Sequence, residues 1–254
     1  MVELSGKVVA ITGGSRGIGF GLAEGVCGAG ASVALLARNL DPLQIAVASL
    51  RERFGEDRVE GFVCDVAHES DVISAFVEID SRFGRLDGVF ANAGISAPHG
   101  GFLESSVAGW SEMLNTNLIG AMTTLREGAR RMISQGDGGS LVAVSSLSAV
   151  DAAPGALAYA ASKAGLLALV RGLAVELARY QIRVNAIVPG WIDTEMTAPL
   201  QSYAKFMDAT LKRTPVRRWG QPHDFVEIAA FLADPTLTFH TGDSLVVDGG
   251  YSIF

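Results

Sequence analysis

A strand, a glycine-rich turn and a helix at the start of the chain restrict its fold more than any other feature. Residues 7–12 form a nearly continuous apolar run, which is typical of a strand buried on both faces of a parallel sheet. The turn Thr12-Gly-Gly-Ser-Arg-Gly-Ile-Gly19 follows, and apolar residues then recur at helical spacing up to Cys27. Glycines let the backbone approach a phosphate closely, and the first turn of a helix offers unpaired N–H groups. The pattern therefore predicts a dinucleotide-binding unit with its pyrophosphate site at this loop.

Apolar runs alternate with helical patterns along the rest of the chain. Further strands are expected near residues 32–37, 59–64, 87–91, 139–146, 182–188 and 244–248, and helices near 41–54, 106–134, 159–180 and 222–233. This alternation predicts an α/β fold: a single-domain, Rossmann-type, doubly wound sheet of seven parallel strands with helices on both faces, spanning residues 1–254. Ligands of such sheets bind outside the carboxyl ends of the strands. The segment 191–211 is rich in large apolar side chains and is expected to form a lid.

Composition excludes several classes of protein. The chain carries 20 Lys and Arg against 27 Asp and Glu, and no basic run is interleaved with aromatic residues, so nucleic acid is not an expected partner. Without a signal-like segment or a run of about 18 apolar residues, a cytoplasmic protein that does not bind a membrane is expected. Cys27 and Cys64 stand alone and the four histidines are scattered, so no metal site is expected and both cysteines are expected in the core.

The end of the second strand predicts the cofactor. An NAD-specific site would be expected to place an acidic residue about 20 residues beyond the glycine loop, but Ala37 stands there, followed by Arg38-Asn39. Arg38, together with Arg16 of the loop, offers guanidinium donors suited to a 2′-phosphate. NADP(H) is therefore the preferred cofactor and NAD is less favoured; the alternative is that Arg38 is an ordinary solvated strand-end residue. Asp65, after the third strand, suits an adenine amino group, although capping of the next helix explains it equally well.

Asn117 lies on the apolar face of the helix expected at 106–134. A buried asparagine must find hydrogen-bond partners or it destabilises the fold. The pattern alone favours a structural bridge to a backbone carbonyl over membership of a site.

Tyr159 and Lys163 are four residues apart on an expected helix and so lie on one face of it. A fixed cation beside a phenol lowers the pKa of the phenol, which is what a tyrosine needs to act as an acid or base near neutral pH. Such pairs also occur by chance on helix surfaces. Ser146 ends the fifth expected strand 13 residues earlier, so it can converge on Tyr159.

Together these residues resemble the short-chain dehydrogenase/reductase family over essentially the whole chain. The glycine loop matches the TGxxxGxG motif of the family, Asn92-Ala-Gly94 its NAG turn, and Tyr159-Ala-Ala-Ser-Lys163 its YxxxK motif. Pro189-Gly190 with Thr194, and Val247-Asp-Gly-Gly250, also match. The implied cofactor contacts are Gly13, Ser15, Arg16, Ile18, Gly19, Arg38, Asn39, Asp65, Val66, Asn92, Gly94, Tyr159, Lys163, Pro189, Ile192 and Thr194.

The resemblance also implies a catalytic tetrad of Asn117, Ser146, Tyr159 and Lys163, which reverses the preference for a structural Asn117. Ser146 and Tyr159 would bind the substrate oxygen, and Tyr159 would be the general acid or base. Lys163 would bias the tyrosine pKa and bind the nicotinamide ribose, and Asn117 would hold a helix kink and a proton-relay water. Family members are commonly tetramers, so a homotetramer is expected.

The expected function is NADP(H)-dependent interconversion of a ketone and a secondary alcohol. The expected pocket walls, residues 95–102, 147–157 and 191–211, are mostly apolar, which favours an uncharged cyclic, aryl or alkyl small-molecule substrate. Lys205, Lys212 and Arg213 are the only lid cations for an acidic one, and His99 is expected to be a loop residue. The alternatives are a 3-oxoacyl-carrier-protein reductase and, in another class, a non-catalytic NADP-binding protein.

Overall fold

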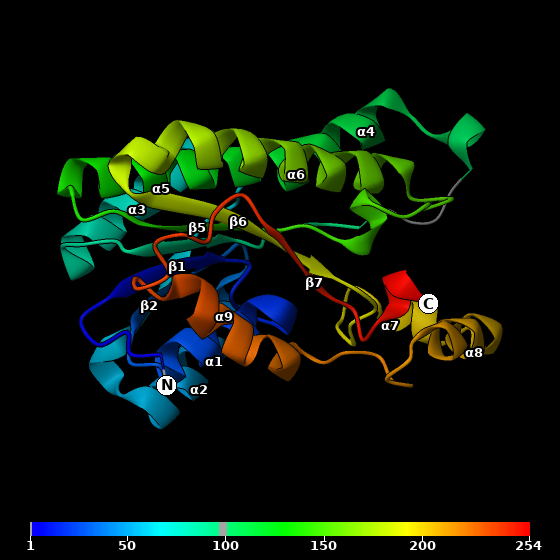
Figure 1. Ribbon diagram of the computed structural model, residues 1–254, viewed down its shortest axis with the longest axis horizontal. Helices are drawn as coiled ribbons and strands as arrows, with labels where there is room; N and C mark the ends of the chain where they lie inside the picture. The colour runs from blue at the N-terminus through cyan, green and yellow to red at the C-terminus, as the bar shows by residue number, and fades with distance from the viewer. Residues whose placement is uncertain (1, 97–100) are drawn as a thin grey trace.

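The computed structural model describes residues 2–96 and 101–254 and shows one parallel sheet between two layers of helices (Figure 1). In this part of the chain the strand order is β3-β2-β1-β4-β5-β6-β7. The strands are β1 Val8–Thr12, β2 Ser32–Ala37, β3 Val59–Val63, β4 Gly88–Ala91, β5 Gly139–Val144, β6 Ile182–Pro189 and β7 Ser244–Val247. The predicted α/β class and the seven parallel strands are confirmed; His99 lies outside the described residues.

Helices cover both faces of the sheet. One layer contains α3 (Glu69–Phe83), α4 (Val107–Leu114), α5 (Gly120–Gln135) and α6 (Leu157–Leu177), and the other contains α1 (Gly17–Gly28), α2 (Leu40–Phe54) and α9 (Val226–Ala233) (Figure 1). The segment expected as a lid forms α7 (Ala198–Gln201) and α8 (Ala204–Arg213), which project beyond the end of the sheet.

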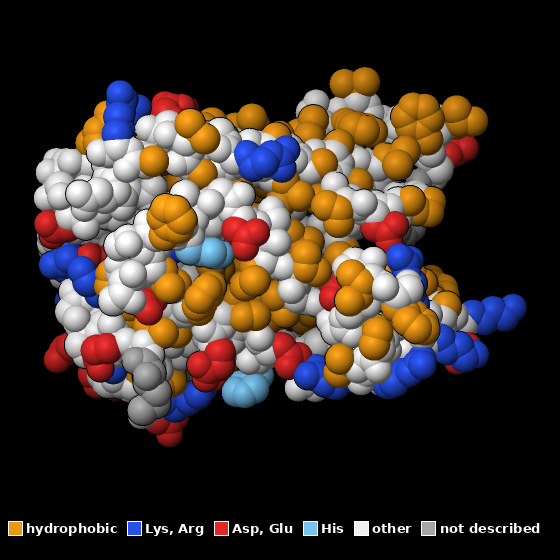
Figure 2. All heavy atoms as spheres, in the orientation of Figure 1, with side chains coloured by type: hydrophobic (Ala, Val, Ile, Leu, Met, Phe, Trp, Pro, Cys, Tyr) orange, Lys and Arg blue, Asp and Glu red, His pale blue; other side chains and the backbone are white. Residues whose placement is uncertain are grey.

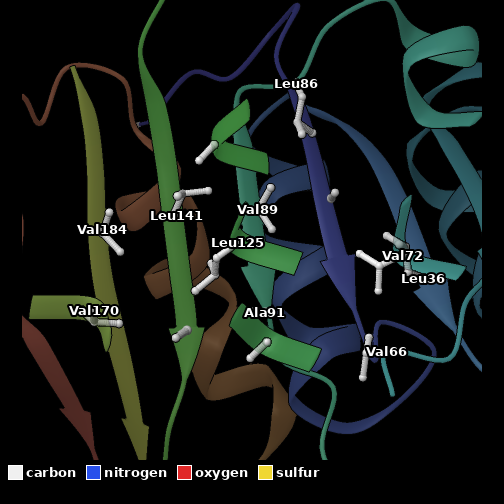
Figure 3. Packing of buried hydrophobic residues seen from close by; sticks show 14 of the residues in the cluster. Leu36, Val66, Val72, Leu86, Val89, Ala91, Leu125, Leu141, Val170 and Val184 are labelled. Carbon is white, nitrogen blue, oxygen red and sulfur yellow. The ribbon is translucent and has the colours of Figure 1, made fainter. Parts of the chain in front are cut away.

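The alternation of side chains along each strand produces two hydrophobic cores. Along β1, Val8 and Ala10 belong to the core under α3, α5 and α6, whereas Val9 and Ile11 belong to the core under α1, α2 and α9. Figure 3 shows the first core, in which side chains from the strands meet Leu125 of α5. Cys27 and Cys64 are both buried, as expected.

The sheet order changes direction at β1, which pairs with β2 on one side and with β4 on the other. Crossover helices leave from opposite faces at this point, so a crevice opens beyond the carboxyl ends of these strands. The glycine loop follows β1 and the Asn92-Ala-Gly94 turn follows β4, so both border the crevice.

One predicted helix is wrong in detail. The helix expected over residues 106–134 is interrupted by a π-helical segment, Asn115–Ile119, between α4 and α5. Such wide turns insert one extra residue and are frequent at functional sites. Here the wide turn contains Asn117, whose side chain bonds to the backbone after β4.

The residues of α6 with the turn that follows it, Leu157–Tyr180, are long and apolar enough to cross a membrane by length and composition alone. Core helices pass the same test. In this structure α6 packs against β6 and contributes Leu166 and Val170 to the first core.

Replacement of Gly25 by alanine is expected to destabilise the fold. A Cβ atom at Gly25 would lie 2.1 Å from the carbonyl oxygen of Val226, where α1 crosses α9. The overlap forces the two helices apart, which costs about 1–3 kcal/mol of unfolding free energy. Gly172→Ala is the control, because a Cβ atom there meets no heavy atom within 4 Å in the described structure; it should stabilise α6 by roughly 0.5–1 kcal/mol. Urea unfolding of both variants tests this, and a Gly25→Ala protein as stable as Gly172→Ala would contradict it.

Candidate active site

The glycine loop packs tightly against the turn after β4. A Cβ atom at Gly19 would lie 2.2 Å from the Gly13 carbonyl oxygen, and one at Gly13 would lie 2.9 Å from Cα of Ala93. Asn92 holds the loop from the other side, because its Nδ2 donates to the carbonyl oxygens of Thr12 at 3.0 Å and Gly13 at 3.1 Å. Only glycine fits these positions.

The amino end of α1 is free to bind an anion. Its N-cap residue, Arg16, makes no side-chain cap hydrogen bond, and no acidic residue lies in the first turn. No acidic side chain of the first turn therefore offsets the positive end of the helix dipole at the first N–H groups of α1. A phosphate site requires such an uncompensated helix end.

Arg38 and Asn39 follow β2 and line the same cleft. The side chain of Arg38 is 63% exposed, and its Nη1 lies 4.0 Å from Oδ2 of Asp65, so the guanidinium can reach a ligand. Asp65 Oδ1 accepts a hydrogen bond from the N–H of Ala67 at 3.0 Å. The N-cap of α3 is His68, so Asp65 closes a local turn and does not cap that helix.

Arg16 spans the cleft to the lid segment. Its guanidinium forms an ion pair with Glu195, and both side chains are more than half exposed. Gly17 lies under Thr194 in the same place, since a Cβ atom on Gly17 would be 3.3 Å from Cγ2 of Thr194. The glycine loop and the segment after β6 therefore meet over the cleft.

Ser146 and Tyr159 meet at the end of β5. The Ser146 hydroxyl accepts a hydrogen bond from the N–H of Ser148 at 3.1 Å, and the Ser146 side chain is near enough to the Tyr159 phenol to lower its pKa. Tyr159 lies in the first turn of α6. Two hydroxyl groups from different elements thus converge on one point of the cleft, as the sequence predicted.

Lys163 is almost completely buried, with 4% of its surface exposed. Its Nζ donates to the carbonyl oxygen of Val144 at 2.8 Å and lies 5.7 Å from the centroid of the Tyr159 ring. Burial lowers the pKa of the Lys163 ammonium from 10.5 to about 8, because water no longer solvates the charge.

The pKa of Tyr159 shifts in the opposite direction from the one expected. Burial raises the pKa of the phenol, and the hydrogen bond from Ser146 offsets part of this effect. The Lys163 ammonium donates to the Val144 carbonyl oxygen and lies 5.7 Å from the centroid of the Tyr159 ring. A phenol with a raised pKa keeps its proton at neutral pH.

Asn117 forms a structural bridge to the backbone after β4. Its Oδ1 accepts from the N–H of Ile95 at 2.8 Å, and its Nδ2 donates to the Ile95 carbonyl at 2.9 Å. A Cβ atom on Gly94 would be 3.2 Å from Asn117 Oδ1 and 3.5 Å from Lys163 Nζ. The structural bridge therefore lies directly beside the buried ammonium, although Asn117 does not itself line the cleft.

The cleft has a volume of about 500 Å³ and collects nearly all the predicted cofactor and catalytic residues. Only Gly19 and Asn117 lie behind its wall. The lining residues among those predicted are Gly13, Ser15, Arg16, Ile18, Arg38, Asn39, Asp65, Val66, Asn92, Gly94, Ser146, Tyr159, Lys163, Pro189, Ile192 and Thr194.

The expected pocket walls are correct in part. Residues 95–96, 192 and 194–197 line the cleft, but residues 101–102, 147–157 and 198–211 do not. Residues 97–100 lie outside the described residues. Two buried serines were missed: Ser145 donates to the Lys163 carbonyl at 2.9 Å, and Ser162 donates to the Tyr159 carbonyl at 2.6 Å. In the sequence, each of these serines could have been recognised as a polar residue within an otherwise apolar strand end or helix face.

Comparisons with known proteins identify the family. The family described as Enoyl-(Acyl carrier protein) reductase matches residues 13–252. Human 3-oxoacyl-[acyl-carrier-protein] reductase is 37% identical over 247 residues, which cover 97% of this chain and 98% of that protein. One similar solved structure is a gluconate 5-dehydrogenase from Burkholderia cenocepacia in complex with NADP and tartrate, with 34% identity and a TM-score of 0.91 over 100% of this chain and 98% of that one. Another is the NADPH-dependent 3-quinuclidinone reductase of Rhodotorula rubra, with 35% identity and a TM-score of 0.92 over 100% of this chain and 94% of that one.

The chain belongs to the short-chain dehydrogenase/reductase family. It is therefore an oxidoreductase of a family that binds NAD(P) and acts on hydroxyl or keto groups of small molecules.

Replacement of Lys163 by methionine is expected to stabilise the cofactor-free protein at pH 7. The pKa of Lys163 is about 8 in the folded protein and 10.5 for an ordinary lysine. Below pH 8 the folded protein is therefore destabilised by the full free energy of burying the lysine charge. That cost is up to about 3 kcal/mol, and it disappears as the pH rises from about 8 to about 10.5. The stability advantage of Lys163→Met over wild type should shrink across this window.

Urea unfolding of both proteins between pH 7 and 10 measures this difference. Lys212→Met is the control, because the Lys212 side chain is 72% exposed and should show no such pH dependence. A constant difference between Lys163→Met and wild type across the window would show that Lys163 is not desolvated.

Proposed function

We propose that the protein reduces a ketone to a secondary alcohol with NADPH, and that Tyr159 is the general acid. The observation that carries this proposal is that Ser146 and Tyr159 line one cleft beside buried Lys163, together with the glycine loop. Two hydroxyls at one point suit a carbonyl oxygen, which accepts hydrogen bonds in two lone-pair directions.

The cleft residues suit NADPH. The uncapped end of α1 suits a pyrophosphate, and Lys163 suits the ribose hydroxyls. Arg38 and Arg16 are the cations available for a 2′-phosphate, and the position at the end of β2 that favours NAD when acidic is Ala37. The bound cofactor would supply the hydride to the carbonyl carbon.

The proton held by the Tyr159 phenol favours reduction over oxidation. A phenol whose pKa is raised holds its proton at neutral pH and can donate it to the oxygen of a carbonyl that is being reduced. The side chain of Asn117 is bonded to Ile95 and lies beside Lys163, so it would act by holding this part of the site in position.

The substrate we propose is an uncharged cyclic, aryl or alkyl ketone. Ile95, Ile192 and Met196 supply apolar surface to the cleft. Of the lid cations, Lys212 is paired with Asp208 and Arg213 with Asp151. The name of the NADPH-dependent 3-quinuclidinone reductase, one of the similar structures, is that of an enzyme acting on a cyclic ketone.

Two other substrate classes remain as candidates because relatives carry their names: a 3-oxoacyl carrier protein and gluconate. Assays with a 3-oxoacyl thioester, a sugar acid and apolar cyclic ketones separate them. Much faster turnover of the sugar acid or the carrier thioester would overturn the proposed substrate class. The expected homotetramer stays a prediction, for which the exposed Val175 of α6 and the edge strand β7 offer apolar surface.

Tyr159→Phe is expected to abolish turnover while leaving the cofactor site intact. The variant removes only the hydroxyl, so kcat should fall by about 10²–10⁴-fold, the usual contribution of a general acid. Steady-state rates and NADPH binding, measured by cofactor fluorescence, test both parts. A kcat within a few-fold of wild type would contradict the role of Tyr159, and binding without turnover of any carbonyl by the wild type would favour a non-catalytic NADP-binding protein.

Arg38→Ala is expected to weaken NADPH selectively. A charge-assisted hydrogen bond contributes about 1.5–3 kcal/mol, so NADPH affinity should fall by roughly 10–100-fold while NADH affinity stays the same. Arg171→Ala on the exposed face of α6 is the matched control and should change neither. Equal losses for both cofactors, or a wild type that prefers NADH, would show that Arg38 does not bind a 2′-phosphate.

A further inference from the structure

We propose that Arg213 is a positioning residue, which holds the Ser146 hydroxyl in place through Asp151. The inference rests on the proposed function, in which Ser146 binds the substrate oxygen. It concerns an ion pair that joins the lid to the turn after β5, outside the cleft itself.

Arg213 is fixed on two sides at the last turn of α8. Its Nη2 donates to Oδ2 of Asp151 at 3.0 Å, and its Nη1 lies 3.4 Å from the Tyr251 hydroxyl. The guanidinium carbon lies 4.2 Å from the centroid of the Tyr251 ring. Stacking on the ring orients the planar guanidinium, so less freedom is lost when it binds the carboxylate.

The Tyr251 ring is itself anchored. It packs edge-on against Trp191 with ring centroids 6.4 Å apart, and Trp191 stacks on Trp219 at 5.6 Å. The indole N–H of Trp219 donates to Thr210 of α8 at 2.9 Å. The C-terminal segment therefore supports Arg213 from a rigid aromatic cluster, and the hollow beside α7 and α8 in Figure 2 is bordered by this supported helix.

Asp151 is connected to Ser146 by a compact hydrogen-bonded turn. The N–H of Asp151 donates to the Leu147 carbonyl at 2.8 Å, and the N–H of Ala149 donates to the Ser146 carbonyl at 3.0 Å. The N–H of Ser148 donates to Oγ of Ser146 at 3.1 Å. A force that fixes the Asp151 carboxylate therefore fixes the turn that orients the serine hydroxyl.

A second ion pair on the same helix provides the matched control. Lys212 Nζ lies 2.6 Å from Oδ2 of Asp208, and both residues belong to α8, so this pair joins α8 only to itself. An exposed pair of this kind has little effect on stability. Asp208→Asn removes it and should leave both activity and the turn unchanged.

The experiment compares Arg213→Gln, Asp151→Asn, their double variant and Asp208→Asn, in the wild-type background and with Ser146→Ala. A small misplacement of a reacting group reduces the rate strongly, so each single variant should lower kcat by about tenfold with NADPH affinity unchanged. The double variant should be no worse than either single variant, since the two residues act as a unit. In the Ser146→Ala background Arg213→Gln should have no further effect on kcat.

Hydrogen exchange at the amides of residues 148–151 gives a readout that does not need turnover. Exchange should be several-fold faster in Arg213→Gln and Asp151→Asn than in wild type and Asp208→Asn. If Arg213→Gln does not fold, Asp151→Asn alone carries the test, because it keeps the contact between Arg213 and Tyr251.

Unchanged exchange and unchanged kcat in both variants would overturn the inference, as would an Arg213→Gln effect of equal size with and without the Ser146 hydroxyl. Tyr159→Phe, assayed in the same series, separates the two proposals. An active Tyr159→Phe enzyme contradicts the proposed function, whereas an inactive one with unaffected Arg213→Gln contradicts only the role of Arg213.

Discussion

The two hydrogen bonds between the Asn117 side chain and the peptide of Ile95 hold the site together. Asn117 is fully buried in the wide turn between α4 and α5, and its Nδ2 also lies 3.3 Å from the Ser162 hydroxyl of α6. A buried amide left without partners would cost a few kcal/mol. This requirement fixes the turn after β4, the π-helical segment and α6 relative to each other, and so places Lys163 and Tyr159 next to the glycine loop.

Burial also determines the protonation of the site. It lowers the pKa of Lys163 to about 8 and raises that of Tyr159, so both groups are less prone to carry a charge in the cleft than in water. The Ser146 side chain opposes this shift of the Tyr159 pKa. A cleft with these properties presents an acid to a carbonyl oxygen, which agrees with the proposed direction of reduction.

The strands and the glycine loop could be predicted because they depend on local pattern. A strand buried on both faces must be apolar throughout, and the spacing of Gly13 and Gly19 is demanded by contacts of the loop with itself. The π-helical segment could not be predicted, because the apolar spacing of residues 106–134 continues across it. The pairs Arg16–Glu195 and Asp151–Arg213 join residues 179 and 62 positions apart, and no local pattern specifies which charges meet across such distances.

The most direct measurement is an ultraviolet titration of Tyr159, taken as the difference spectrum between the wild-type protein and Tyr159→Phe without cofactor. The account predicts that the phenol ionises above its ordinary pKa of 10, because burial outweighs the hydrogen bond from Ser146. Ionisation below 10 would contradict it. That result would mean that the Lys163 charge already stabilises the phenolate, and that the free enzyme presents a base to an alcohol and not an acid to a ketone.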